Sequence, residues 1–361
     1  MNRKKIKINN ITISDTSRPF IVAEAGVNYY DIAKKENIGL TEAAELMIRE
    51  AAKAGANAIK FQTYKAKTLA SKYSPAYWDL RKEPITSQYE LFKKFDKLTK
   101  KNYQELANFA KKQKIIFMST PFSREAVDFL TDLVPAFKIA SADITNFPLL
   151  RQIGKKKKPI FLSTGASTIE EIKEALKIIE EEGNDQVVLL HCVLNYPTKN
   201  RDANLKMITG LQRTFPNYLI GYSDHTLPDK NMTVLTTSYI LGARVIEKHF
   251  TLDKSIKGND HFHSMDPNDL RTFKNNVEFL EKILGKAEKT PLKSEKISIN
   301  YARRSLVANR ELPQGKKISF RDIAIKRPGT GISPKFLNEI IGKKTKRKIK
   351  EDEIIKWKDL F

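Results

Sequence analysis

Short apolar runs alternate with amphipathic helical patterns from Pro19 to about Leu284. Eight of the runs are continuous and β-rich, which is typical of strands buried on both faces of a parallel sheet. They begin at Phe20, Ala58, Ile115, Ala136, Pro159, Val187, Tyr218 and Ala243. Helical patterns such as residues 40–55 and 168–183 separate most of them, and Ser167 or Thr168 is expected to cap the second. This alternation over about 265 residues predicts an α/β fold, a (β/α)8 TIM barrel.

Two segments depart from the repeating pattern. Residues 1–18 alternate between apolar and polar positions, which predicts a small hairpin that closes the barrel floor. A long segment between Thr63 and about Lys100 follows the second strand, and at this end of a barrel it indicates a lid or a substrate wall. The sequence leaves the role of residues 64–100 open.

The pattern of apolar and polar residues changes after Leu284. Residues 285–300 are polar, lysine-rich and without clear periodicity, which predicts a linker. Residues 301–361 contain short strand patterns and turn signals, and so predict a compact β-rich module that is small for independent stability. The expected organisation is a barrel domain over 1–284, including the hairpin at 1–18, then the linker and the module.

Charge and composition narrow the classes of partner. The net charge is +23, but the lysines are spread along the chain and aromatic residues do not interleave with them. This indicates solvated helix faces and no nucleic-acid partner, although a diffuse positive field would help an anionic substrate to arrive. No apolar run approaches the roughly 18–20 residues that span a bilayer, and the first residues lack the apolar region of a secretory signal. One cysteine, Cys192, fits a reducing compartment, so we expect a cytoplasmic protein without a membrane partner.

Polar side chains stand at the carboxyl end of nearly every expected strand, where TIM-barrel active sites gather. They are Glu24, Lys60, Gln62, Thr120, Lys138, Ser141, Ser163, Thr164, Asn195, Tyr196, Ser223, His225, Glu247 and His249. A lysine inside a buried strand is costly unless it is paired or functional, which favours a functional role for Lys60 and Lys138. With the hydroxyls they suit a ligand that carries a phosphate and a carboxylate, although each hydroxyl alone could cap a helix.

The five histidines all lie between His191 and His263. His225 and His249 follow consecutive strands, with Asp224, Glu247 and Asp260 nearby, and this pattern predicts a divalent metal at the barrel mouth. The alternative is a pair of hydrogen-bonded core histidines. We expect a structural role for His191 and an exposed or substrate-rim position for His261 and His263.

Glu24 lies in AEAGVN, beside the expected lysine cluster. Neighbouring positive charges should keep its carboxyl ionised. It could orient a hydroxylated substrate or act as a general base on water. The alternative is an ion pair with Lys60 and no direct chemistry.

The ordered motifs resemble those of one enzyme family. They are AEAGVN, KFQTY, STPFS, FKIAS, LSTG, YPT, YSDHT, EKHFTLD and GNDH. Together they identify the chain as similar to the sialic acid (N-acetylneuraminate) synthases, a family that includes legionaminate and pseudaminate synthases. The tail from about Ser305, with KRPGTGI around Arg327, is similar to the antifreeze-like (SAF, β-clip) domain that these enzymes carry.

The resemblance implies a transferase that condenses phosphoenolpyruvate with N-acetylmannosamine or a related 2-acetamido sugar. The products would be a nine-carbon 2-keto acid and phosphate. It implies that His225 and His249 hold Mn²⁺, with Mg²⁺ or Co²⁺ as alternatives. The residues implied for phosphoenolpyruvate are Lys60, Thr120, Lys138, Ser141, Ser163 and Ser223. Those implied for the sugar are Glu24, Gln62, Tyr196 and Asp260, with Tyr301 and Arg327 reaching it from the partner of a domain-swapped homodimer.

Three departures from the family pattern border the implied sugar site. Tyr29 and Tyr30 follow Asn28, where the family often has a histidine, and an extended loop to Ile38 is expected. Leu194 holds the position of an asparagine in some members, so that Asn195 comes one place later. The segment from Thr63 to about Lys100 is particular to this chain. The acceptor therefore stays open between N-acetylmannosamine and a 2,4-diacetamido-6-deoxy hexose, phosphorylated or not. The preferred metal, and whether it or Glu24 assists the water, also stay open.

Two rival functions differ in what they predict. The 3-deoxy sugar-acid synthases run the same chemistry on other aldoses but are not expected to carry the C-terminal module. A non-enzymatic basic binding protein would cluster its lysines on one face and would lack a convergent site.

Overall fold

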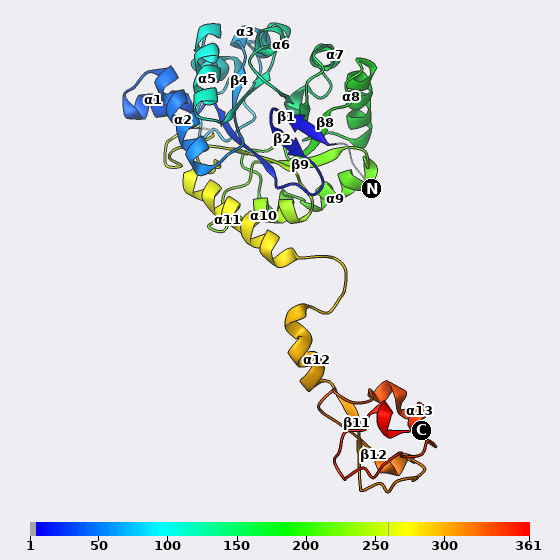
Figure 1. Cartoon of the computed structure of the whole chain (residues 1–361). Coiled ribbons are helices and arrows are strands. Elements are labelled where there is room, and N and C mark those ends of the chain that lie inside the picture. The colour runs from blue at the N-terminus through cyan, green and yellow to red at the C-terminus, as the bar shows by residue number, and fades with distance from the viewer. Residues whose placement is uncertain (1–4, 259) are drawn as a thin grey trace. The chain divides into compact units, whose positions relative to one another are not determined.

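The computed structural model describes residues 5–258 and 260–361 (Figure 1). Residues 1–4 of the predicted hairpin and Asn259 of the GNDH motif lie outside the described residues. The chain divides into two compact units, one that ends at Ile283 and one that begins at Leu284. Each unit is described by itself.

The first unit is built on one parallel eight-stranded sheet. The strand order is β5-β4-β3-β10-β9-β8-β7-β6, and β5 and β6 approach each other at the ends of this order, so the sheet curls nearly shut. The strands are β3 (Phe20–Gly26), β4 (Ala58–Thr63), β5 (Ile116–Pro121), β6 (Phe137–Ile139), β7 (Ile160–Ser163), β8 (Val187–Cys192), β9 (Leu219–Asp224) and β10 (Val245–His249). All eight predicted strands form, and the TIM-barrel prediction is confirmed.

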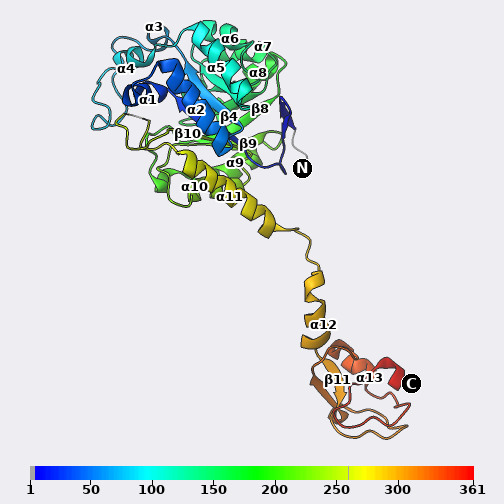
Figure 2. The same cartoon turned by 60° about the vertical axis from the view of Figure 1, so that its left-hand side comes forward.

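Helices surround the sheet, as Figures 1 and 2 show. They are α1 (Tyr29–Glu36), α2 (Leu40–Ala54), α5 (Lys100–Lys112), α6 (Arg124–Leu130), α7 (Phe147–Lys155), α8 (Ile169–Glu181), α9 (Lys206–Thr214), α10 (Thr233–Ile240) and α11 (Pro267–Leu284), with short 3-10 turns at Ser141–Asp143 and Asn200–Asp202. Thr168 caps α8 by accepting a hydrogen bond from the Glu171 amide at 3.2 Å. No described helix meets the length and hydropathy that a bilayer-spanning segment requires.

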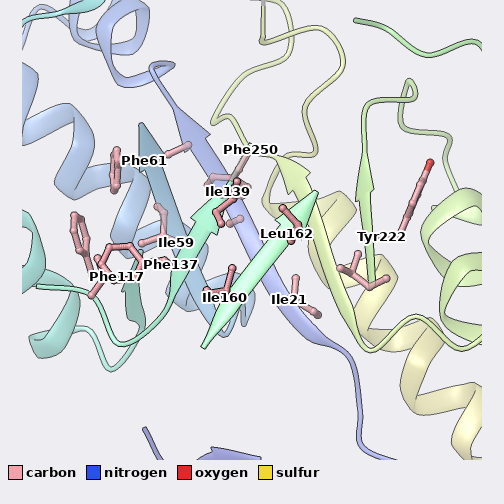
Figure 3. Close-up of a cluster of buried hydrophobic side chains, with 14 of the residues drawn as sticks. Ile21, Ile59, Phe61, Phe117, Phe137, Ile139, Ile160, Leu162, Tyr222 and Phe250 are labelled. Atoms are coloured by element: carbon pink, nitrogen blue, oxygen red, sulfur yellow. The ribbon is translucent and has the colours of Figure 1, made fainter. Parts of the chain in front are cut away.

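Alternation along each strand separates two apolar layers. Ile21, Ile59 and Phe61 point outward and pack with the helices, together with the other side chains in Figure 3. Residues one position away, such as Phe20 and Val22, belong to a second cluster inside the barrel. The period of two in a strand therefore assigns every second side chain to the barrel interior.

The barrel floor is closed by the predicted hairpin. Strands β1 (Ile6–Ile8) and β2 (Ile11–Ile13) pair antiparallel. Ile6, Ile8 and Ile13 are buried in the same cluster as the inward side chains of the barrel strands. The hairpin thus covers apolar surface that the lower ends of the strands would otherwise expose.

Two connections on the opposite side are more ordered than expected. The segment after β4 contains α3 (Ala66–Leu69) and α4 (Gln88–Phe95), and has its own small apolar cluster around Trp78. The prediction of an extended loop from Tyr29 to Ile38 is wrong, because the helix α1 forms there. Tyr29, Ile32 and Ala33 bury one face of that helix at helical spacing.

The second unit folds around a small apolar cluster that includes Leu306, Ile318 and Ile355. Its two strands, β11 (Ser305–Ala308) and β12 (Ile323–Lys326), pair antiparallel, and α13 (Leu337–Ile340) and 3-10 turns at Phe320–Asp322, Pro334–Phe336 and Trp357–Asp359 complete it. The segment predicted as a linker contains a 3-10 turn at Lys293–Glu295 and the helix α12 (Lys296–Ala302). The helix α12 buries none of its side chains, so its sequence has no pattern of buried apolar positions that would have predicted a helix.

Removing a hairpin side chain should destabilise the barrel. Ile8→Ala creates a cavity in the floor cluster, and we expect a loss of about 2–5 kcal/mol in the free energy of unfolding. The exposed neighbour Lys7 is the control, because Lys7→Ala should change it by less than about 0.5 kcal/mol. Urea unfolding followed by circular dichroism measures both variants. Equal effects would contradict the role given to the hairpin.

Candidate active site

The predicted strand-end residues converge on one cavity at the barrel mouth. It has a volume of about 420 Å³. The predicted residues that line it are Glu24, Lys60, Gln62, Thr120, Lys138, Ser141, Ser163, Tyr196, Ser223, His225 and His249. Most of them occupy inward positions at the carboxyl ends of strands, above the apolar floor layer, and the other three, Ser141, Tyr196 and His225, lie in the connections that follow β6, β8 and β9.

Four buried charged groups form the centre of this cavity. Lys60 forms an ion pair with Glu24, lies 3.7 Å from Glu247 Oε1 and donates to Thr120 Oγ1 at 3.1 Å. Lys138 Nζ lies 3.6 Å from the same Glu247 oxygen. All four charged side chains are at most 6% exposed. The sequence pattern placed Glu247 near the histidines but did not assign it a role. Its inward position in a barrel that also directs two lysines inward was the signal that could have indicated an ion-pairing role.

Burial and pairing shift the pKa values of these groups in different directions. Burial raises the pKa of Glu24 to about 7 even though Lys60 opposes the shift, so the neighbouring lysine does not keep this pKa at its ordinary value as expected. Burial also lowers the pKa of Lys138. Burial alone would raise the pKa of Glu247, but Lys138 and Lys60 hold it below its ordinary value. One carboxyl can therefore exchange a proton near neutral pH while the other remains a fixed negative charge.

The hydroxyl groups face the cavity rather than capping helices. Ser223 donates to Glu247 Oε1 at 3.1 Å, and Ser141 accepts from the Gly165 amide at 2.9 Å. The buried Ser163 Oγ has no hydrogen-bond partner among the described residues. Since a buried hydroxyl normally has a partner, Ser163 has an open donor for a ligand.

The two predicted metal ligands lie side by side. The ring centroids of His225 and His249 are 5.5 Å apart, and both side chains are buried. His225 Nδ1 donates to the Val193 carbonyl at 2.9 Å, which leaves Nε2 as the nitrogen with a lone pair. His249 Nδ1 has no hydrogen-bond partner among the described residues. Burial, with His263 and His225 nearby, holds the pKa of His249 well below its usual range, so its imidazole is neutral as a metal ligand must be.

Of the two positions expected for His261 and His263, the exposed one is wrong, because both side chains are completely buried, and the substrate-rim position stays a prediction. His261 Nδ1 lies 2.7 Å from Thr251 Oγ1. The His263 ring lies 4.8 Å from that of His249, and ligand atoms of His249, Asp260 and His263 all lie within 4.8 Å of one another. These three residues form a second possible ligand set. The polar loop composition hid this packing, although the flanking Phe262 and Met265 were a signal of burial.

His191 lies apart from the metal candidates. Its Nε2 is 2.8 Å from the Ala203 carbonyl, and its ring stacks on Tyr222 at 5.4 Å. This arrangement agrees with the structural role expected from the sequence.

The predicted sugar residues divide between the two units. Gln62 donates to Glu24 Oε1 at 3.2 Å, and the Tyr196 ring lies 4.2 Å from that of His225. Asp260 lines a narrower adjoining cavity, where burial raises its pKa to about 6. Tyr301 and Arg327 belong to the second unit and are exposed there. The structure thus brings together the predicted residues of the barrel unit.

Comparison with known proteins decides the family. The NeuB family matches residues 47–289, and the SAF domain matches residues 303–360. The chain belongs to the NeuB family. It is 38% identical to the N,N'-diacetyllegionaminic acid synthase of Legionella pneumophila, over 98% of both chains, and 32% identical to the N-acetylneuraminate-9-phosphate synthase of Drosophila melanogaster, over 93% of this chain and 94% of the relative.

A solved structure extends the likeness to three dimensions. The N-acetylneuraminic acid synthetase of Leptospira borgpetersenii is 33% identical, with a TM-score of 0.71 over 82% of this chain and 96% of that one. The predicted resemblance to sialic acid synthases, with an antifreeze-like domain at the C-terminal end, is confirmed. This NeuB-family chain therefore has nonulosonate synthases as relatives along nearly its whole length.

The raised pKa of Glu24 predicts a pH-dependent stability difference. Its folded pKa of about 7 exceeds the ordinary value of 4.5, so its contribution to stability is full below pH 4.5 and is lost as the pH rises to 7. Glu24→Gln stays neutral, and its melting temperature should rise relative to that of the wild type across this window. Thermal unfolding of chelator-treated protein from pH 4.5 to 8 measures this, with the exposed Glu174→Gln as control. A constant difference would contradict the assignment.

Proposed function

We propose that this protein condenses phosphoenolpyruvate with N-acetylmannosamine or a related 2-acetamido sugar, and releases phosphate and a nine-carbon 2-keto acid. The observation that carries the proposal is the cavity in which two buried lysines and an open serine hydroxyl face the buried imidazoles of His225 and His249. Relatives that are named as nonulosonate synthases support it. The test is phosphate release from phosphoenolpyruvate with a panel of 2-acetamido sugars, with the product identified by mass spectrometry.

Phosphoenolpyruvate would bind on the lysine side of the cavity. Lys60 and Lys138 supply positive charge, and Thr120, Ser141, Ser163 and Ser223 supply short donors for the phosphate and carboxylate oxygens. Glu24 and Glu247 balance the two lysines before the substrate arrives. Holding both reactants in one cavity removes much of the entropic barrier of the bimolecular step.

His225 and His249 fit a divalent cation, Mn²⁺ by the resemblance. The Val193 carbonyl fixes the tautomer of His225, and the neutral His249 has an unpartnered buried nitrogen. When bound, such a cation supplies Lewis-acid polarisation of the aldehyde of the open-chain sugar.

The reaction then follows from the positions of the two substrates. The C3 carbon of phosphoenolpyruvate bonds to the aldehyde carbon, and positive charge develops at C2. Water adds to C2 and the C2–O bond to phosphate breaks, so that a keto group forms at C2, one water proton ends on the former aldehyde oxygen and the other on the released phosphate. With a pKa of about 7, Glu24 can accept the proton of that water, while Gln62 fixes its carboxylate. Glu247, whose pKa the two lysines hold below its ordinary value, lines the same cavity and would stabilise the positive centre.

A 2,4-diacetamido-6-deoxy hexose is the second candidate acceptor. Two N,N'-diacetyllegionaminic acid synthases are each 38% identical to this chain, whereas pseudaminic acid synthases are 34–35% identical. The product would then be legionaminate or pseudaminate. The convergent cavity disfavours a non-enzymatic basic binding protein.

We also propose that the protein forms a homodimer and works in the cytoplasm. A homodimer would place Tyr301 and Arg327 of one subunit at the sugar bound in the barrel of the other, with the Arg327 guanidinium donating to the N-acetyl carbonyl. The single cysteine is free and buried, which supports work in the reducing cytoplasm.

Metal binding should depend on the two cavity histidines. His225→Ala and His249→Ala should abolish Mn²⁺ binding in calorimetry as well as turnover, and chelator should inactivate the wild type reversibly. His191→Ala removes a buried imidazole elsewhere and should retain the ion. His263→Ala discriminates between the two possible ligand sets. Loss of Mn²⁺ binding in this variant would show that Asp260 and His263, rather than His225, bind the ion together with His249.

The lysines should govern phosphoenolpyruvate affinity. Lys60→Met or Lys138→Met removes a charge-assisted contact and should weaken phosphoenolpyruvate binding by about 1.5–3 kcal/mol, with a smaller effect on the sugar. The exposed Lys53→Met is the control. Unchanged affinity by calorimetry, in a variant whose circular dichroism is native, would remove that lysine from the site.

The composite site makes mixed dimers informative. Arg327→Ala and His249→Ala subunits should each be nearly inactive alone, but their mixture should recover part of the activity, because mixed dimers contain one intact site. Native mass spectrometry confirms that the subunits have mixed. Mixed dimers without recovered activity would show that Arg327 does not act across the subunits.

A further inference from the structure

A buried ion pair joins the carboxyl ends of β9 and β10, the two strands that precede the predicted metal ligands. Lys248 donates to Asp224 Oδ2 at 2.5 Å, and both side chains are 1% exposed. The two residues are also the last register pair between these strands. Neither is among the described residues that line the main cavity. The proposed reaction therefore leaves this buried pair without a role.

Strand alternation places the ion pair and the histidines on opposite faces of the sheet. Glu247 lines the cavity, so Lys248 points outward, and the next residue, His249, lines the cavity again. Asp224 ends β9, and His225 follows it directly into the cavity lining. Each member of the ion pair thus precedes one imidazole in the chain. A fixed contact between the two outward side chains therefore restrains the spacing of the backbone positions that carry the imidazoles.

Further hydrogen bonds hold both chain neighbours of His225 to this pair. The Lys248 ammonium also donates to the Thr226 carbonyl at 2.6 Å. Thr226 donates to Asp224 through its amide at 2.9 Å and through its hydroxyl at 3.0 Å. The residues before and after His225 are therefore bound to the side chain of the residue before His249. We refer to Asp224, Thr226 and Lys248 as the strand-end cluster.

Stability by itself is a weak reason for this cluster. The cost of removing two ions from water can exceed the attraction between them, and an apolar pair of similar volume is often as stable. The ion pair does, however, define a geometry. Tyr222 donates to Asp224 Oδ1 at 2.8 Å, so both carboxylate oxygens have donors and the orientation of the carboxylate is fixed. Groups that orient metal ligands from behind typically change metal affinity by about 10–100-fold.

We infer that the strand-end cluster positions His225 and His249 at the spacing that a divalent cation requires. The inference rests on the proposed function, because it takes these two imidazoles as the ligands. Asp224 and Lys248 are then positioning residues, which act through the histidines and do not touch the substrates.

A double variant, Lys248→Met with Asp224→Asn, tests the inference. It removes the ion pair without leaving a buried charge, and the new amide can still accept from Tyr222 and donate to the Thr226 hydroxyl. We expect native circular dichroism, but Mn²⁺ affinity in calorimetry about 10–100-fold weaker than that of the wild type. The electron paramagnetic resonance spectrum of bound Mn²⁺ should also change, because it depends on the geometry of the ligands.

An ion pair elsewhere in the barrel unit provides the matched control. Lys94 and Glu83 pair at 3.0 Å in the segment after β4, and the Glu83 side chain is 4% exposed. Lys94→Met with Glu83→Gln makes the same chemical change away from the strand-end cluster and should keep the Mn²⁺ affinity of the wild type. Thr226→Val removes one hydroxyl from Asp224 and should weaken Mn²⁺ binding by about 2–10-fold. This single variant decides the question if the double variant does not fold.

The outcomes separate the inference from the proposed function. Wild-type Mn²⁺ affinity and an unchanged spectrum in the folded variants of the strand-end cluster would overturn the inference and leave the metal site intact. An equal loss of affinity in the control pair would also overturn it. Failure of Mn²⁺ to bind the wild-type protein would instead overturn the proposed metal site, and the inference with it.

Discussion

Lys60 and Lys138 share the barrel mouth with Glu24 and Glu247, and all four side chains are buried. Ions removed from water are tolerated only when they are paired. Here the pairing is shared, since a single oxygen of Glu247 faces both lysines. Removal of Lys60 would leave Glu24 without its ion-pair partner, and removal of Glu247 would leave Lys138 without one, so the rest of the site depends on this balance. In the proposed reaction, an anionic substrate would share the same two cations.

The barrel makes this arrangement possible by holding the strands in register. In the register of the sheet, His249 of β10 lies beside Glu24 of β3, and Glu24 lies beside Lys60 of β4. Below them the inward positions are apolar, and the N-terminal hairpin closes that layer. The polar residues therefore gather at one end of the barrel, above an apolar layer, and are themselves buried, so charge interactions among them are strong. The histidine pair lies at the same level, within reach of the aldehyde in the proposed reaction.

Two connections distinguish the site from a bare barrel mouth. The segment after β4 forms its own apolar cluster, which gives the adjoining cavity an aromatic wall. The segment that follows β10 buries His261 and His263 beside His249 and Asp260. The sequence indicated a lid or a substrate wall for residues 64–100, but it did not predict the aromatic cluster of that segment or the burial of the two histidines. Both come from packing between segments rather than from a local period.

The sequence by itself determined the strands, the inward positions at their ends and the family. Alternation with a period of two assigns Lys60, Lys138 and Ser223 to one surface, whatever the details of packing. The tertiary structure alone decided what depends on distance and burial. Glu247 became the shared partner of two lysines, the carboxyl of Glu24 acquired a pKa of about 7, and His263 came to lie beside His249. These properties arise between buried side chains of segments far apart in the chain, and no local pattern encodes them.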